Sequence, residues 1–162
     1  MTPKTQKELD AIQQECYAMV TKRSALAAGT SAIPTPGVDI AADIAILLEL
    51  IPTINRKFGL SKDQIDDYDP LVKQAILTVI KTAGAAMIGT EVTKIVITQA
   101  LKKVAGRVIT KQALKFIPIV GWAANAAIGF TAMKYVGDSH VDDCFDVCKR
   151  IISQQEHHQS DD

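Results

Sequence analysis

The feature that most constrains this chain is a pair of proline–glycine corners, each lying between two segments with the apolar spacing of helices. The first corner reads Ile-Pro-Thr-Pro-Gly over residues 33–37, and the second reads Ile-Pro-Ile-Val-Gly over residues 117–121. Proline disfavours helical geometry in the residue before it, and glycine readily ends a helix, so each corner predicts a turn between two helices. The corner residues are Pro34, Pro36, Gly37, Pro118 and Gly121.

Apolar residues that recur every three or four positions predict helices around these corners. We expect the first helix from about residue 9 to the corner at residue 33, the second over residues 38–58 and the last over residues 122–153. Between the two hairpins, Ser61 begins a capping-box pattern, and Asp69 followed by proline predicts the start of another helix.

Glycine and threonine predict the remaining helix ends. We expect Gly59 to cap the second helix at its C-terminus. A break at Gly84 and Gly89 is expected to precede a helix that Thr90 caps. We expect Gly106 to interrupt that helix, because glycine weakens helix interiors.

Together these segments predict an all-α fold, a single helical bundle of about six helices built from two pseudo-repeated helix–IPxxG–helix hairpins. The bundle is expected to cover residues 1–153, followed by a polar and disordered tail over residues 154–162. The second corner lies 84 residues after the first, from residue 33 to residue 117, and Arg23 then aligns with Arg107. This alignment supports a structural repeat.

Composition and motifs exclude several classes of function. The net charge is zero and aromatic residues make up only 5%, which argues against a nucleic-acid partner. The chain has no phosphate-binding loop, no nucleophile elbow and no zinc-protease pair, so we expect no enzymatic activity and no cofactor. It has no signal-peptide pattern, and its three cysteines do not form a disulfide framework, so we expect a cytoplasmic protein.

A basic segment follows the middle of the chain. From Glu91 to Gly137 there are seven cations and one anion, whereas seven acids lie from Asp138 onward. Four of the cations, spaced four residues apart, form a stripe on a helix that would suit an anionic membrane surface. An ordinary solvated face, or pairing with the acidic last helix, would explain them equally well. The stripe consists of Lys103, Arg107, Lys111 and Lys115.

The segment over residues 116–133 has 18 residues without a charge, which reaches the lower limit of roughly 17–25 for a membrane-spanning helix. Pro118 and Gly121 break it near its start, so we favour a buried helix or reversible insertion over a span. Trp122, just beyond the corner, is either a core residue or an anchor at the membrane interface.

His140, Cys144 and Cys148 lie four residues apart and therefore share one helical face. Imidazole and thiolate are zinc ligands, although a fourth ligand would have to come from elsewhere. The neighbouring valines indicate instead that the two cysteines are small core residues. We therefore regard the three residues only as weak metal candidates and expect no bound metal.

The corners also resemble a known family. Residues 28–43 (Ala-Gly-Thr-Ser-Ala-Ile-Pro-Thr-Pro-Gly-Val-Asp-Ile-Ala-Ala-Asp), with Phe-Gly-Leu at residues 58–60, look like the helical C-terminal region of immunity-related GTPases. They are also similar to an uncharacterised bacterial membrane-associated helical family found beside GTPase domains. The second corner is similar to the second signature of these families. The resemblance covers most of residues 24–137 and implies an all-α fold, membrane association and partnership with a GTPase.

Two functional hypotheses follow. The first is a non-enzymatic helical module that associates peripherally with anionic membrane surfaces or lipid, as a partner or effector of a GTPase or as a homo-oligomer formed by self-assembly. The alternative is a soluble helical protein that binds an apolar small molecule, a lipid or a partner helix between its two hairpins.

Overall fold

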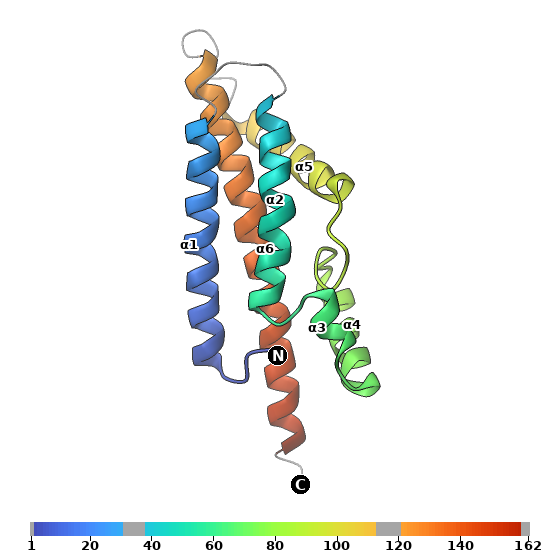
Figure 1. Ribbon diagram of the computed structural model, residues 1–162. Coiled ribbons are helices and arrows are strands. Elements are labelled where there is room, and N and C mark those ends of the chain that lie inside the picture. The colour runs from blue at the N-terminus through green and yellow to red at the C-terminus, as the bar shows by residue number, and fades with distance from the viewer. Residues whose placement is uncertain (1, 31–37, 113–120, 160–162) are drawn as a thin grey trace. The chain divides into compact units, whose positions relative to one another are not determined.

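The computed structural model describes residues 2–30, 38–112 and 121–159, and within these ranges the chain is all-helical (Figure 1). Side chains are described for residues 2–27, 41–104 and 129–154. The predicted fold class, all-α with about six helices, is confirmed. The helices are α1 (Gln6–Thr30), α2 (Val38–Lys57), α3 (Lys62–Asp66), α4 (Pro70–Ala83), α5 (Lys94–Gln112) and α6 (Gly121–Gln159).

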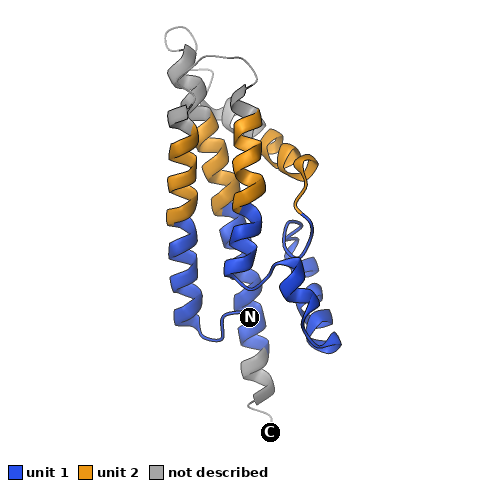
Figure 2. Ribbon diagram, viewed as in Figure 1, with its two compact units in different colours: residues 1–17, 51–91, 139–162 blue, residues 18–50, 92–138 orange. Residues whose placement is uncertain are grey.

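The chain divides into two compact units (Figure 2). Unit 1 contains residues 1–17, 51–91 and 139–162, and unit 2 contains residues 18–50 and 92–138. Each unit has its own buried apolar residues, because the inner faces of its amphipathic helices pack together. In unit 1 these include Leu9, Ile54, Phe58, Leu60, Ile65, Ile76 and Val141, and in unit 2 Val20, Leu47, Ile97, Met133 and Val136.

Local sequence signals set the helix ends of unit 1 as predicted. Gly59 has a positive φ of 71°, and the next residue, Leu60, donates its N–H to the carbonyl of Asn55 at 2.8 Å. This pattern closes the C-terminus of α2. The N-cap Ser61 donates its N–H to Oε1 of Gln64 at 3.2 Å, which confirms the capping box.

The start of α4 is also confirmed. Asp69 is the N-cap residue, and its Oδ1 accepts a hydrogen bond from the N–H of Leu71 at 3.0 Å. Pro70 takes the first helical position, where its missing N–H costs nothing. Gly84 ends the helix in the left-handed conformation, with φ of 73°.

Two predictions about α5 are wrong. Thr93, not Thr90, lies at its start: the Oγ1 of Thr93 accepts from the N–H of Val96 at 3.4 Å. The hydroxyl of Thr90 instead donates to the carbonyl of Ala86 at 3.1 Å and belongs to the preceding turn. Gly106 does not interrupt α5, because a single glycine costs a helix only about 1 kcal/mol.

Unit 2 brings α1 and α6 into close contact at Gly137. A Cβ atom on this glycine would lie 2.6 Å from Cγ1 of Val20, so only a residue without a side chain fits. On α1 and α2, Arg23 and Glu49 form an ion pair at 2.7 Å. The helix α6 passes through Gly137 without interruption and extends to Gln159, beyond its predicted end near Ser153.

The corners themselves lie largely outside the described residues. This holds for Pro34, Pro36, Gly37 and Pro118, whereas Gly121 is the first residue of α6. The described helices flank both corners in the predicted order, with α1 and α2 around the first and α5 and α6 around the second. The predicted repeat of the two hairpins stays a prediction.

Candidate functional site

The predicted basic stripe falls mainly on α5, in unit 2. Lys103 is exposed there. Arg107 and Lys111 are on the same helix, but their side chains lie outside the described set, and Lys115 is outside the described residues altogether. Lys103 is therefore the one stripe residue whose side chain is described, and the exposed residues around it were not part of the predicted stripe.

The helix α5 has a buried face and an exposed face. Ile97, Leu101 and Val104 are buried and lie four and three residues apart, which places them on one side. The opposite side exposes Ile95, Gln99, Lys102 and Lys103. Ile95 is 69% exposed. We call these four residues the α5 outer face.

The lysines in and next to the α5 outer face have no acidic partner among the described side chains. Lys94, Lys102 and Lys103 form no ion pair with any described side chain. No acid occurs in α5 between Lys94 and Gln112. The face therefore presents Lys102 and Lys103, which have no ion-pair partner among the described side chains, beside an exposed apolar residue. This combination favours contact with an anionic and partly apolar surface.

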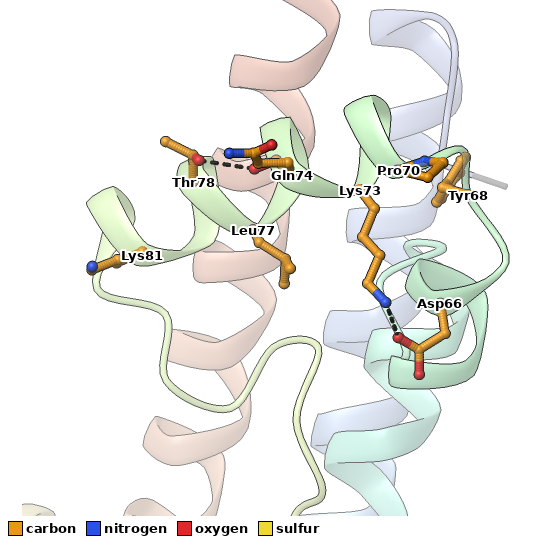
Figure 3. Close-up of a pocket in the computed structure, with 8 residues that line it drawn as sticks. All are labelled: Asp66, Tyr68, Pro70, Lys73, Gln74, Leu77, Thr78 and Lys81. Atoms are coloured by element: carbon orange, nitrogen blue, oxygen red, sulfur yellow. Dashed lines mark hydrogen bonds and ion pairs between the residues drawn. The ribbon is translucent and has the colours of Figure 1, made fainter.

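A second exposed surface lies on α4, in unit 1, where an open groove of about 520 Å³ runs along the helix (Figure 3). Lys73, Leu77 and Lys81 follow one another at four-residue intervals and line this groove together. Lys73 projects from α4 to bind Asp66 at 2.7 Å. The other residues around the groove are Tyr68, Pro70, Gln74 and Thr78.

Sequence reasoning missed this surface. Six large apolar side chains are exposed among the described residues, and three of them, Leu71, Val72 and Leu77, lie on α4. A signal was present, because α4 contains two lysines and no acid, and its apolar residues exceed what one buried face needs.

The predicted His140, Cys144 and Cys148 are all fully buried in unit 1, and Asn55 of α2 joins two of them. Nε2 of His140 lies 2.8 Å from Oδ1 of Asn55, and the thiol of Cys144 lies 3.5 Å from the same oxygen. The amide of Asn55 also donates to the carbonyl of Met87 at 2.8 Å, in the segment between α4 and α5. Asn55 therefore ties α6 to that segment.

Burial determines the protonation state of each titratable group in this cluster. Burial raises the pKa of Cys148 to about 12 and that of Cys144 well above its usual value, so both stay thiols at neutral pH. Burial lowers the pKa of His140 to about 4, so its imidazole is neutral. No group of three or more His, Cys, Asp or Glu among the described residues is arranged to hold a metal ion.

Two predictions concerned the membrane: a span or insertion of residues 116–133, and the role of Trp122. Within the described ranges, no helix is both long and apolar enough to cross a bilayer. Trp122 is the second residue of α6, and its side chain lies outside the described set, so its predicted role as an interface anchor is not tested.

We compared the chain with protein-family models, curated proteins and solved structures, and none of them matches.

Proposed function

We propose that this chain is a non-enzymatic helical module that binds anionic membrane surfaces through the α5 outer face. The observation that carries the proposal is a pair of exposed lysines, Lys102 and Lys103, beside the 69% exposed Ile95. Neither lysine has an ion-pair partner among the described side chains. Lysine next to an anionic leaflet contributes about 1 kcal/mol per residue, and an exposed apolar side chain adds binding by entering the headgroup layer.

The order of residues along α5 suits this role. Ile95 and Lys102 are seven residues apart, two helical turns, so they lie on the same side of the helix. Arg107 and Lys111 continue the basic character toward the C-terminus of the same helix. A helix that lies flat on a bilayer meets phosphates along its whole length, and each added cation strengthens the contact.

The family resemblance of the two corners extends the proposal to a partner. We include a GTPase partner, or self-assembly into homo-oligomers, as the way in which the module acts once it is on the membrane. A peripheral position on the cytoplasmic leaflet agrees with this, because that leaflet carries the anionic lipids.

Vesicle flotation at low salt tests the proposal. The wild-type chain should float with vesicles that contain phosphatidylserine and should not float with pure phosphatidylcholine. Substituting both Lys102→Gln and Lys103→Gln should weaken binding about 30-fold, since two lysines contribute about 2 kcal/mol. The matched control is the double variant Lys7→Gln and Lys22→Gln, which removes two exposed lysines of α1.

The control variant has the same net charge as the α5 variant, so it separates a local contact from an effect of total charge. We expect it to bind like wild type. Equal losses in the two double variants would reject a specific α5 contact, and failure of the wild-type chain to float at low salt would reject the whole proposal. The single variant Ile95→Ser should also weaken vesicle binding, and the dependence of that binding on salt should stay as in wild type.

A further inference from the structure

The α5 outer face carries an inference that deepens the proposed membrane binding and rests on it. We propose that this face recognises the charge density of an anionic bilayer and not an individual lipid headgroup. Its ligand is therefore the whole class of anionic phospholipids, and binding follows the charge that these lipids give to the leaflet. A polyphosphorylated headgroup, such as that of a phosphoinositide, is bound no more tightly than its added charge requires.

The charge that supports this inference lies within one unit. Unit 2, residues 18–50 and 92–138, contains nine cations and four acids, whereas unit 1 contains nine cations and fourteen acids. The net charges of the two units are therefore +5 and −5. Five of the nine cations of unit 2 belong to α5, and this helix contains no acid. Attraction to anionic lipid is consequently a property of unit 2 and above all of α5.

The two lysines of the face point in different directions. Lys102 and Lys103 are consecutive, so they leave the helix about 100° apart. Lys102 lies on the same side as Ile95, whereas Lys103 lies toward one edge of the face. A site for a single polyphosphate needs donors that converge on one point, such as bidentate arginines or a series of backbone N–H groups. Two diverging lysines instead reach two separate lipids.

No acid holds either ammonium group in one position. The described ion pairs include neither Lys102 nor Lys103, whereas Lys73 of α4 is oriented by Asp66 at 2.7 Å. A lysine ammonium is a compact charge on a flexible stem, and it binds phosphate as a point charge. The other members of the face, Ile95 and Gln99, are uncharged. The described side chains of the face therefore supply charge and apolar area without the fixed donors of a headgroup site.

The start of α5 does not supply a headgroup site either. A helix N-terminus binds phosphate through its free N–H groups. Here the Oγ1 of Thr93 accepts from the N–H of Val96 at 3.4 Å, so one of these donors is already engaged. Glu91, three residues before Lys94, places a negative charge just ahead of the helix in the sequence, which disfavours a second anion there.

Vesicle flotation with matched lipids tests the inference on the wild-type chain. One set of vesicles contains phosphatidylserine, and a second contains its D-serine isomer. A third contains phosphatidylinositol 4,5-bisphosphate at the fraction that gives the same zeta potential. We expect the three affinities to agree within about threefold. A larger preference for any one lipid would show that its headgroup is recognised and would reject the inference.

Moving one charge tests the same point within the protein. Lys102→Gln with Gln99→Lys shifts one cation within the α5 outer face and keeps the net charge, so it should bind phosphatidylserine vesicles like wild type. The matched control, Lys102→Gln with Gln14→Lys, moves the cation to an exposed site of α1 in unit 1. It should bind about fivefold more weakly, since one lysine contributes about 1 kcal/mol. Circular dichroism confirms that both variants keep their helices.

Each outcome decides the inference. If the shift within α5 weakens binding as much as the move to α1, the position of Lys102 matters, so the inference is rejected while the proposed function stands. If neither variant binds more weakly, the charge of α5 does not drive the contact, and both proposals are rejected. Failure of the wild-type chain to float with any of the anionic vesicles also rejects both.

Discussion

The inner face of α6 in unit 1 buries its polar groups and pairs them, whereas the α5 outer face in unit 2 exposes them to water. On α6, His140 is 0% exposed and meets Asn55, which also accepts from Cys144 and donates to Met87. On α5, Lys102 and Lys103 are exposed and have no ion-pair partner among the described side chains. The first arrangement pairs its polar groups inside the protein, whereas the second leaves its ammonium groups in contact with water.

The difference has a thermodynamic basis. A buried polar group that loses its partner keeps the full cost of leaving water, about 1–3 kcal/mol. An exposed lysine stays hydrated, so its removal changes the free energy of unfolding little. Substitutions in the α6 cluster should therefore lower stability, whereas substitutions in the α5 outer face should weaken membrane binding.

The largest effect is expected at Asn55. Asn55→Leu keeps a similar volume but leaves Nε2 of His140 and the carbonyl of Met87 without their partner. We expect the free energy of unfolding to fall by about 3 kcal/mol in urea titrations. Gln99→Leu, the same change at an exposed site of α5, is the control and should lie within about 0.5 kcal/mol of wild type. A loss below about 1 kcal/mol for Asn55→Leu would refute the stabilising role of the cluster.

The next effect is a pH dependence that comes from His140. Burial lowers the pKa of this imidazole to about 4 in the folded chain, against about 6.5 in the unfolded chain. Between these values the unfolded chain binds the extra proton, so stability is complete above about pH 6.5 and falls as the pH drops toward 4. We expect the free energy of unfolding to be about 2 kcal/mol lower at pH 5 than at pH 7.

His140→Gln isolates this contribution, because glutamine does not titrate. Asp143 acts in the opposite sense: burial and the neighbouring acids Asp142 and Asp146 raise its pKa, so its protonation favours the folded chain as the pH falls. The difference in pH dependence between wild type and His140→Gln is therefore the quantity to measure. An unchanged pH dependence in the variant would show that His140 is protonated without cost and is not sealed from water.

An intermediate effect is expected in unit 2 at Gly137, where a Cβ would lie 2.6 Å from Cγ1 of Val20. Alanine strengthens helices, but the clash outweighs that gain, so Gly137→Ala should cost about 1–2 kcal/mol. Adding Val20→Ala should recover part of the loss in a double-mutant cycle. Gly129→Ala, where the nearest atom is Oδ2 of Asp43 at 3.4 Å, is the control. It lies in the same helix without a clash and should raise the free energy of unfolding by about 0.5–1 kcal/mol. If the changes in unfolding free energy of Gly137→Ala and Val20→Ala simply add in the double variant, the close contact between the two residues is ruled out.

The sequence predicted those features that depend on neighbouring residues. The caps at Gly59, Ser61 and Asp69 are set within a few positions, and all three are confirmed. Local signals failed to identify the residue at the start of α5, because Thr90 and Thr93 have the same capping preference. The hydroxyl of Thr90 donates to the carbonyl of Ala86 in the preceding turn, and Thr93 accepts from the N–H of Val96 at the start of the helix.

The candidate sites were less predictable, because they depend on contacts between distant residues. Asn55 and His140 are 85 positions apart, so no local pattern joins them. Their meeting requires α2 and α6 to pack, and only then does the face shared by His140 and Cys144 become an interior polar cluster. On α4, periodicity identifies an amphipathic helix but does not show that Leu77 stays exposed, because that depends on which neighbours cover the helix.

The smallest effect on stability is expected at Lys102 and Lys103, where we also expect the largest effect on membrane binding. The double variant Lys102→Gln and Lys103→Gln should keep the free energy of unfolding within about 0.5 kcal/mol of wild type, because neither ammonium group has a described partner to lose. Lys134→Gln makes the same change at a half-buried site of unit 2. There it removes a 2.6 Å ion pair with Asp138, whose Oδ1 is already buried without a hydrogen bond, and should cost about 1 kcal/mol. Urea titrations measure both variants. A loss above about 1 kcal/mol in the α5 double variant would show that its lysines support the fold, and the contrast with the interior of α6 would then disappear.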